Sequence, residues 1–195
     1  DSMASVNSTM LPLGTPVPQI DLPDASGHRW QLDVDAPSSP ALVVAFVCNH
    51  CPYVQHLGPA FGTAAAEWMA AGAVVVAINA NDADAYPDDA PAAMDPTESS
   101  WGWEFPYLVD ATQATAVAFG AACTPDFYVF DAARRLAYRG RFDASTPRND
   151  EPLSGVELDA AVRAVLAGEA PDPDQWPSIG CSIKWRPGNE PPWFG

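Results

Sequence analysis

The sequence feature that most constrains the fold is an apolar strand that leads directly into a Cys-x-x-Cys motif and a helix. Residues 41–47 read Ala-Leu-Val-Val-Ala-Phe-Val, which has the length and β-branched content of a strand buried on both faces. From about 49 to 71, apolar residues recur three or four positions apart, as on one helix face; they are Val54, Leu57, Phe61, Ala65 and Trp68. The pattern predicts a strand and a helix joined at Cys48-Asn49-His50-Cys51-Pro52.

This junction predicts a redox chemistry for the two cysteines. The first turn of a helix has unpaired N–H groups and the positive end of the helix dipole, and both favour a thiolate over a thiol. On this argument Cys48 is the more acidic sulfur, and Cys51 can close a small, reversible disulfide with it. A protonated His50 would stabilise the thiolate and make the pair more oxidising. Pro52 fits the first turn, where its missing N–H has little to lose.

A Cys-x-x-Cys pair is also half of many zinc sites, so a metal site is the alternative. His50 or His56 would then supply nitrogen ligands beside the two sulfurs, for zinc or copper(I). Structural zinc sites usually lie on a knuckle or loop, not between a buried strand and a long helix. We therefore favour the redox interpretation and expect no metal and no other cofactor.

Composition limits the domain count and the classes of partner. A chain of 195 residues with 48% hydrophobic content can bury one full core. A formal charge of −16 would repel nucleic acid and anionic membrane surfaces, so neither is expected as a partner. No apolar stretch approaches membrane-spanning length, and the N-terminus has no basic region followed by an apolar one. We expect a cytoplasmic protein, with an exported form as the alternative.

The rest of the chain alternates strand and helix patterns. The expected elements are a Pro-rich hairpin over 16–32, a buried strand at 73–78, a long acidic connection at 79–105, a strand at 106–110, a helix at 111–122, strands at 126–131 and 135–143, and a helix within 153–168. The strands at 41–47 and 73–78 flank the helix, so they should be parallel neighbours. In the acidic connection, Asp88 or Asp89 could cap a short helix. In the last helix, Val156, Leu158, Val162 and Leu166 are the expected buried side.

These elements predict a single folded domain over residues 14–170. Residues 1–13 are small and polar and are expected to be loose. The tail from 171 to 195 is rich in Pro and Trp, and it should lie irregularly on the domain surface.

The order of elements resembles the thioredoxin fold, and more closely the thioredoxin-like branch of the alkyl hydroperoxide reductase and thiol-specific antioxidant superfamily. The resemblance covers about residues 14–168 and rests on the hairpin with Asp24-Ala25-Ser26-Gly27, the cysteine motif and the Thr124-Pro125 step. Ser178-Ile179-Gly180-Cys181-Ser182-Ile183-Lys184-Trp185 looks like the C-terminal signature of a bacterial subgroup of these proteins. The resemblance implies an α/β fold with a central mixed β-sheet flanked by helices.

It also implies a role for Thr124-Pro125. In thioredoxin-like proteins the matching proline is cis and lies against the disulfide, which leaves the backbone of the preceding residue free to pair with substrate. Here that residue is Thr124. The chain departs from thioredoxin in having no acid within 41–47, so the general base for Cys51 is not identified.

The predicted function is that of a thiol–disulfide oxidoreductase. Cys48 attacks a substrate disulfide and Cys51 resolves the mixed disulfide, with Asn49, His50 and Pro52 completing the catalytic loop. The substrate would be a disulfide-bearing protein, or a small thiol or peroxide; the upstream reductant is left open.

A peroxiredoxin-like peroxidase is the runner-up. The peroxidatic cysteine of those enzymes is followed by Pro and preceded at three positions by Thr, so Cys51 would take that role with Cys48 in the Thr place. The arginine that activates peroxide lies just before the strand that begins here near 126, where this chain has none. Arg139 or Arg141 could substitute only if their hairpin folds over the site.

The other two cysteines suggest a second thiol pair. Cys123 directly precedes Thr124-Pro125, and the tail could bring Cys181 to it as a staple or as a relay that reduces the first pair. The alternative is two unrelated cysteines.

Overall fold

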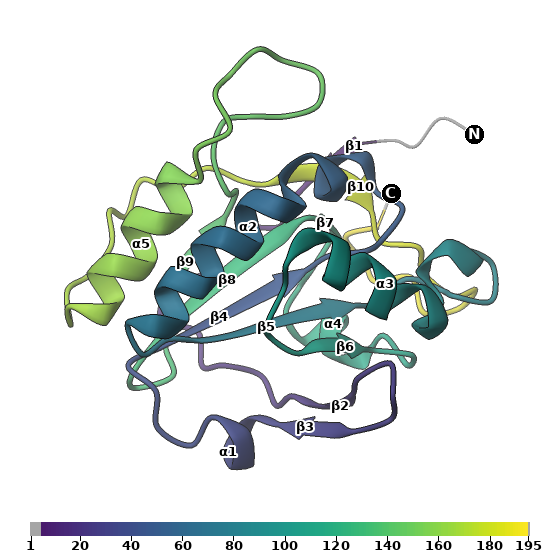
Figure 1. The fold of residues 1–195 in the computed structure, drawn as a ribbon, viewed down its shortest axis with the longest axis horizontal. Coiled ribbons are helices and arrows are strands. Elements are labelled where there is room, and N and C mark those ends of the chain that lie inside the picture. Colours follow the sequence, from purple (N-terminus) through teal and green to yellow (C-terminus); the bar gives the residue numbers. More distant parts are fainter. Residues whose placement is uncertain (1–4, 195) are drawn as a thin grey trace.

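The structure is a computed structural model that describes residues 5–194, and its centre is a five-stranded mixed sheet in the order β6-β5-β4-β8-β9 (Figure 1). The strands are β4 (Ala41–Phe46), β5 (Val74–Asn79), β6 (Tyr107–Val109), β8 (Asp126–Asp131) and β9 (Leu136–Gly140). β4, β5 and β6 are parallel, whereas β8 and β9 are antiparallel to their neighbours. This is the mixed α/β arrangement expected of a thioredoxin-like fold.

Helices and a hairpin cover the two faces of this sheet. α2 (Pro52–Ala70) and α5 (Val156–Leu166) pack on one face, together with the aromatic residues that follow α3 (Pro91–Trp101). The other face is covered by the hairpin of β2 (Asp21–Pro23) and β3 (Arg29–Gln31), by α1 (Leu32–Asp35) and by α4 (Ala114–Ala118). All six side chains of β4 are 0% exposed, as predicted for a strand buried on both faces.

Helix faces agree with the sequence pattern in α2 and differ in α5. The five apolar residues that predicted α2 are all buried; they are Val54, Leu57, Phe61, Ala65 and Trp68. In α5 the buried residues are Leu158, Ala161, Val162 and Val165. Val156 is 60% exposed, which corrects the expectation, because it occupies the first turn, on the side away from this stripe.

The long connection between β5 and β6 holds more structure than its sequence indicated. A 3-10 turn, η1 (Pro87–Asp89), precedes the 11-residue helix α3. Trp103 and Phe105 then pack around Phe61 in the core, with ring centroids 5.5 and 5.2 Å from that ring. Within residues 5–194, no helix is long and apolar enough to cross a membrane.

Both ends of the chain contribute to a second, three-stranded sheet, which corrects two expectations. Its order is β1 (Ser5–Asn7), β10 (Ile179–Ser182), β7 (Cys123–Thr124), and all pairs are antiparallel. Residues 5–7 are therefore not loose, and the tail is not irregular throughout; residues 1–4 lie outside the described part. Figure 1 shows β10 beside β1 near the first turn of α2. The cause is backbone pairing between segments distant in sequence.

Candidate active site

α2 begins three residues later than the sequence pattern indicated, and this changes which cysteine lies at its N-terminus. Its first residue is Pro52 and its N-cap is Cys51, whose carbonyl accepts hydrogen bonds from the N–H groups of Val54 and Gln55 at 3.0 and 2.9 Å. A proline disfavours helical geometry in the residue before it, and Cys51 is extended, with φ −71° and ψ 120°. The positive end of the helix dipole therefore faces Cys51, not Cys48.

The electrostatics of the two sulfurs follow this placement. Burial alone would raise the pKa of Cys51, but hydrogen bonds from Cys181, Cys48 and Thr124 lower that pKa far below the usual thiol range. The pKa of Cys48 is raised instead, by its burial first, then by its hydrogen bond to Cys51 and by the charge of Asp89. The direction of the two pKa shifts therefore runs against the expectation that Cys48 is the more acidic sulfur and favours Cys51 instead.

Thr124 touches both sulfurs. The Thr124–Pro125 peptide bond is cis, as predicted. The Thr124 hydroxyl lies 3.4 Å from Cys48 Sγ, and the Thr124 carbonyl oxygen lies 3.1 Å from Cys51 Sγ, which as a thiol can donate to it. Both cysteine side chains are 0% exposed. Thr124 therefore contacts the sulfur atoms of both motif cysteines, one through its side chain and one through its backbone.

The backbone edge of Thr124 is not free. β10 pairs with β7 so that Cys181 lies opposite Thr124 and Ser182 lies opposite Cys123. The chain's own tail therefore occupies the position that the family resemblance assigned to a substrate backbone.

The same register corrects the proposed pairing of Cys123 with Cys181. Residues directly opposite in an antiparallel pair point to the same face, and the next residue points to the other face. Cys123 therefore points away from Cys181; its thiol is directed at the Pro125 carbonyl, 3.7 Å away, and burial raises its pKa. Cys181 instead lies opposite Thr124 in the same buried cluster as Cys51, and Cys51 is the largest cause of its raised pKa, which the sequence gave no reason to expect.

A residue missed by the sequence reasoning, Asp89, organises the cysteine loop. Its carboxylate accepts hydrogen bonds from the N–H groups of Asn49 at 2.7 Å and His50 at 3.2 Å, from the His50 ring and from the Asn81 amide at 2.7 Å. Asp89 is 2% exposed. From the sequence, Asp89 was only a candidate helix cap. Its contact with Asn49 could not be predicted, because the two residues are 40 positions apart in the chain.

His50 and Asn49 are held by this network. The hydrogen bond to Asp89, followed by the charges of Asp89 and Cys51, raises the pKa of His50 above its ordinary value despite partial burial. The His50 ring also stacks on Tyr86, with centroids 5.7 Å apart. Asn49 donates to the Asp88 carbonyl and accepts from the Tyr107 hydroxyl, both at 3.0 Å. His50 therefore tunes charge near the sulfurs, whereas Asn49 fixes the shape of the loop.

Three residues of the site offer ligand atoms that lie close enough together to bind one metal ion. Cys48, His50 and Asp89 each offer one ligand atom, and these atoms lie within 4.8 Å of one another. A sulfur, nitrogen and oxygen set suits zinc, but both Asp89 oxygens already accept hydrogen bonds. His56 is not in this group; its Nε2 lies 2.6 Å from the Ser145 hydroxyl.

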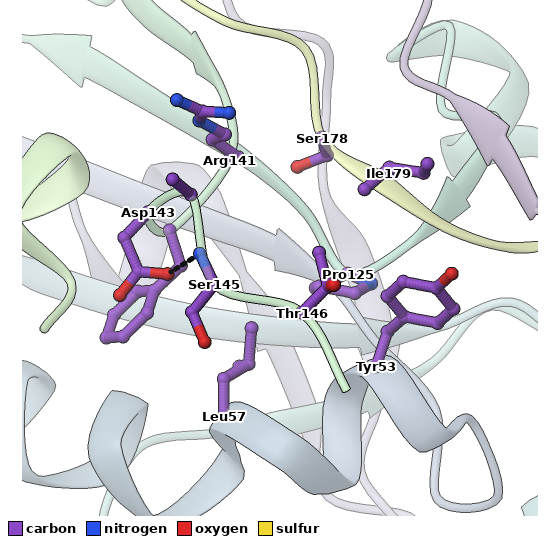
Figure 2. Close-up of a pocket in the computed structure, with 11 residues that line it drawn as sticks. Tyr53, Leu57, Pro125, Arg141, Asp143, Ser145, Thr146, Ser178 and Ile179 are labelled. Carbon is purple, nitrogen blue, oxygen red and sulfur yellow. Dashed lines mark hydrogen bonds between the residues drawn. The ribbon is translucent and has the colours of Figure 1, made fainter. Parts of the chain in front are cut away.

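A small cavity of about 40 Å³ opens beside Pro125, and it is large enough for water-sized molecules. Figure 2 shows Tyr53, Pro125 and Thr146 among the residues that line it. Arg141 lines it but is paired with Glu157 at 2.7 Å.

Arg139 turns elsewhere, to the Leu11 carbonyl at 2.9 Å and to Gln175 at 2.7 Å. Both Arg139 and Arg141 are therefore paired with other groups, and the hairpin places neither of them over the cysteines as a free arginine.

Comparisons with known proteins place the chain among redox proteins. The AhpC/TSA family matches residues 13–139. An uncharacterised conserved protein from Geobacillus kaustophilus is 44% identical, over 96% of this chain and 99% of that chain, with a TM-score of 0.92. No curated protein sequence gives a significant match.

Two functionally described structures share the fold at low identity. A secreted disulfide oxidoreductase of Mycobacterium tuberculosis, homologous to E. coli DsbE, is 19% identical over 75% of this chain and 96% of its own, with a TM-score of 0.57. Peroxidoxin BcpB of the same organism is 18% identical over 81% and 97%, with a TM-score of 0.59.

Proposed function

The chain belongs to the AhpC/TSA family, and from this premise we propose that it is a thiol–disulfide oxidoreductase in which Cys51 is the nucleophile and Cys48 the resolving thiol. The observation that carries the proposal is the buried sulfur pair at the start of α2, with Cys51 as the N-cap and lowered in pKa. These roles are the reverse of those inferred from the sequence, because the helix begins at Pro52.

The reaction follows from the contacts of the two sulfurs. The Cys51 thiolate attacks one sulfur of a substrate disulfide, and the other substrate sulfur leaves as a thiolate. Cys51 is then uncharged, so the hydrogen bond and charge that help to hold Cys48 protonated are gone. Cys48 loses its proton and attacks Cys51, which breaks the mixed disulfide and releases the second substrate thiol. The protein is left with a Cys48–Cys51 disulfide, and an external thiol must reduce it.

Access to Cys51 favours a small substrate. Both sulfurs are 0% exposed, and β10 already pairs with the backbone at Thr124. A low-molecular-weight disulfide such as oxidised glutathione needs less opening of the site than a folded protein does. We therefore propose small disulfides as the substrate class.

The test is a glutathione redox titration with alkylation of each cysteine read by mass spectrometry. We expect Cys48 and Cys51 to oxidise together at a potential between about −270 and −120 mV. Cys51→Ser should abolish exchange with oxidised glutathione. Cys123→Ser is the matched control, since Cys123 is also 0% exposed but faces away, and it should exchange like the wild type. Wild-type exchange by Cys51→Ser would refute the proposal.

Thiol peroxidase activity is the second candidate, and the enclosed, acidic Cys51 is the observation that favours it. Hydrogen peroxide is close to water in size, and a cavity that admits water-sized molecules lies beside Pro125, next in sequence to the Thr124 that contacts Cys51. Peroxide would oxidise the Cys51 thiolate to a sulfenic acid, releasing water. Dimedone labelling of Cys51 after peroxide treatment tests this activity, and peroxide consumption no faster than that of Cys51→Ser would rule it out.

A further inference from the structure

Cys181 lies inside the candidate site although it is separated from it by most of the chain. It is 3% exposed and belongs to the same buried cluster as Cys48 and Cys51. Its strand, β10, is held by β1 on one side and β7 on the other, so its position is set by backbone pairing on both edges. The tail therefore adds a third sulfur to the pair that the motif supplies.

The register fixes which way Cys181 points. Cys181 is directly opposite Thr124, so the two side chains share a face of the small sheet. The Thr124 hydroxyl lies 3.4 Å from Cys48 Sγ, and the Thr124 carbonyl oxygen lies 3.1 Å from Cys51 Sγ. Cys51 and Cys181 also shift each other's pKa in opposite directions, as do Cys51 and Cys48, so Cys51 is a near neighbour of both other sulfurs.

Gly180 allows β10 to lie close to Thr124 of β7. A Cβ at this position would be 2.0 Å from the Thr124 carbonyl oxygen and 2.6 Å from the Thr124 carbonyl carbon. Any other residue would push the strands apart at the point where Cys181 meets Cys51. The spacing between these two sulfurs thus depends on a glycine that is next in sequence to Cys181.

We propose that Cys181 is a second resolving thiol, so that Cys51 can form a disulfide with either Cys48 or Cys181. This inference rests on the proposed function, since it requires Cys51 to react with a substrate disulfide. In the added route, the Cys181 thiolate attacks the Cys51 sulfur of the mixed disulfide. The Cys51–Cys181 bond forms, the bond from Cys51 to substrate breaks, and the departing substrate thiolate takes up the proton that Cys181 gave up. A dithiol reductant then restores both thiols.

The charges around Cys181 fit this order of events. The hydrogen bond to Cys51 is the largest cause of its raised pKa, followed by burial and then by the Cys51 charge. The Cys51 contributions vanish once Cys51 is bound to a substrate sulfur, whereas the positive charges of Lys184 and Arg148 continue to favour the Cys181 thiolate. Cys48 lacks this help, because the negative charge of Asp89 remains beside it.

The test uses oxidised glutathione as the substrate and peptide mapping without reduction as the readout. In Cys48→Ser, we expect a Cys51–Cys181 disulfide and little glutathione left on Cys51. In the double variant Cys48→Ser with Cys181→Ser, we expect the Cys51–glutathione mixed disulfide to accumulate. Adding Cys123→Ser to Cys48→Ser is the matched control, and it should still give the Cys51–Cys181 disulfide.

The outcomes separate this inference from the proposed function. If Cys48→Ser accumulates as much Cys51–glutathione as the double variant and its Cys181 alkylates fully, Cys181 is not a resolving thiol. The proposed function would survive that result as long as the wild type still forms Cys48–Cys51. If neither wild-type cysteine oxidises, the proposed function fails instead. Gly180→Ala in the Cys48→Ser background is an independent check, since it keeps every remaining thiol and should slow formation of the Cys51–Cys181 disulfide.

Discussion

Asp89→Asn should destabilise the protein by about 2–4 kcal/mol, because it removes the charged acceptor at the centre of the cysteine loop. One carboxylate oxygen, Oδ1, accepts from the N–H groups of Asn49 and His50, and an asparagine oxygen can replace it there. The other oxygen, Oδ2, accepts from the His50 ring and from Asn81. An amide nitrogen at that place would face two donors, so two hydrogen bonds are lost. Two bonds to a charged group at about 1.5–3 kcal/mol each sum to about 3–6 kcal/mol, and a rotation of the Asn81 amide that recovers part of this leaves a loss of about 2–4 kcal/mol.

The pH dependence of this loss identifies its electrostatic part. The folded pKa of His50 is raised, so its contribution is complete below the unfolded value of about 6.5 and is lost as pH rises through the folded pKa. The folded pKa of Asp89 is lowered, because hydrogen bonds from His50 and Asn81 outweigh its burial. Its contribution is therefore present above about pH 4 and is lost as pH falls through the folded pKa. The difference between wild type and variant should be largest between about pH 4 and 6.5.

Thermal denaturation at pH 6 and at pH 9 measures both effects. A loss of about 3 kcal/mol corresponds to a fall in Tm of roughly 6–12 °C for a chain of this size. Asp88→Asn is the matched control, since the exposed Asp88 contacts Asn49 only through its backbone carbonyl; its stability should change by less than about 0.5 kcal/mol. An Asp89→Asn variant that melts with the wild type, or that loses equal stability at both pH values, would refute the reasoning.

Three further predictions concern the sulfurs, the tail and the core. The ultraviolet absorbance of thiolate should persist in the wild type well below pH 7 and should be missing in Cys51→Ser, because the pKa of Cys51 is lowered; equal absorbance in the two proteins would contradict the assignment. Gly180→Ala should lower stability by about 1–3 kcal/mol in urea denaturation, since its Cβ would meet the Thr124 carbonyl, whereas Ser182→Ala should not. Phe61→Ala should cost about 3–5 kcal/mol in the same assay, because this ring is 0% exposed; a loss below 1 kcal/mol would show that the core does not depend on it.

Local patterns were sufficient to predict the central sheet and its largest helix. β4 reads as a continuous apolar run, and all of its side chains are buried. The periodicity of α2 identified its buried face correctly, and the cis bond at Thr124–Pro125 was expected from the position of Pro125 in the order of elements. Each of these features depends on neighbouring residues or on the order of elements along the chain.

Most of the features that were not predicted depend on contacts between distant segments. One depends on a local effect, the start of α2 at Pro52 and not at about residue 49. Cys181 reaches Cys51 through pairing among β1, β10 and β7, which no sequence period reveals. Asp89 contacts the cysteine loop from a long, acidic connection in which the sequence indicated only a helix cap at Asp88 or Asp89. The lower pKa of Cys51 relative to Cys48 has a local cause, because the helix begins at Pro52, and a proline disfavours helical geometry in the residue before it.

The second sheet also determines how the protein would respond to a mechanical load between its two ends. Ser5 lies opposite Cys181, and Asn7 lies opposite Ile179, so a pull on the two ends enters this strand pair at the Ser5–Cys181 end. In that geometry the backbone bonds open one after another, as in unzipping, and are not sheared together. Once the contacts of residues 183–194 are released, the first strand position to take the load is the one that carries the sulfur beside Cys51.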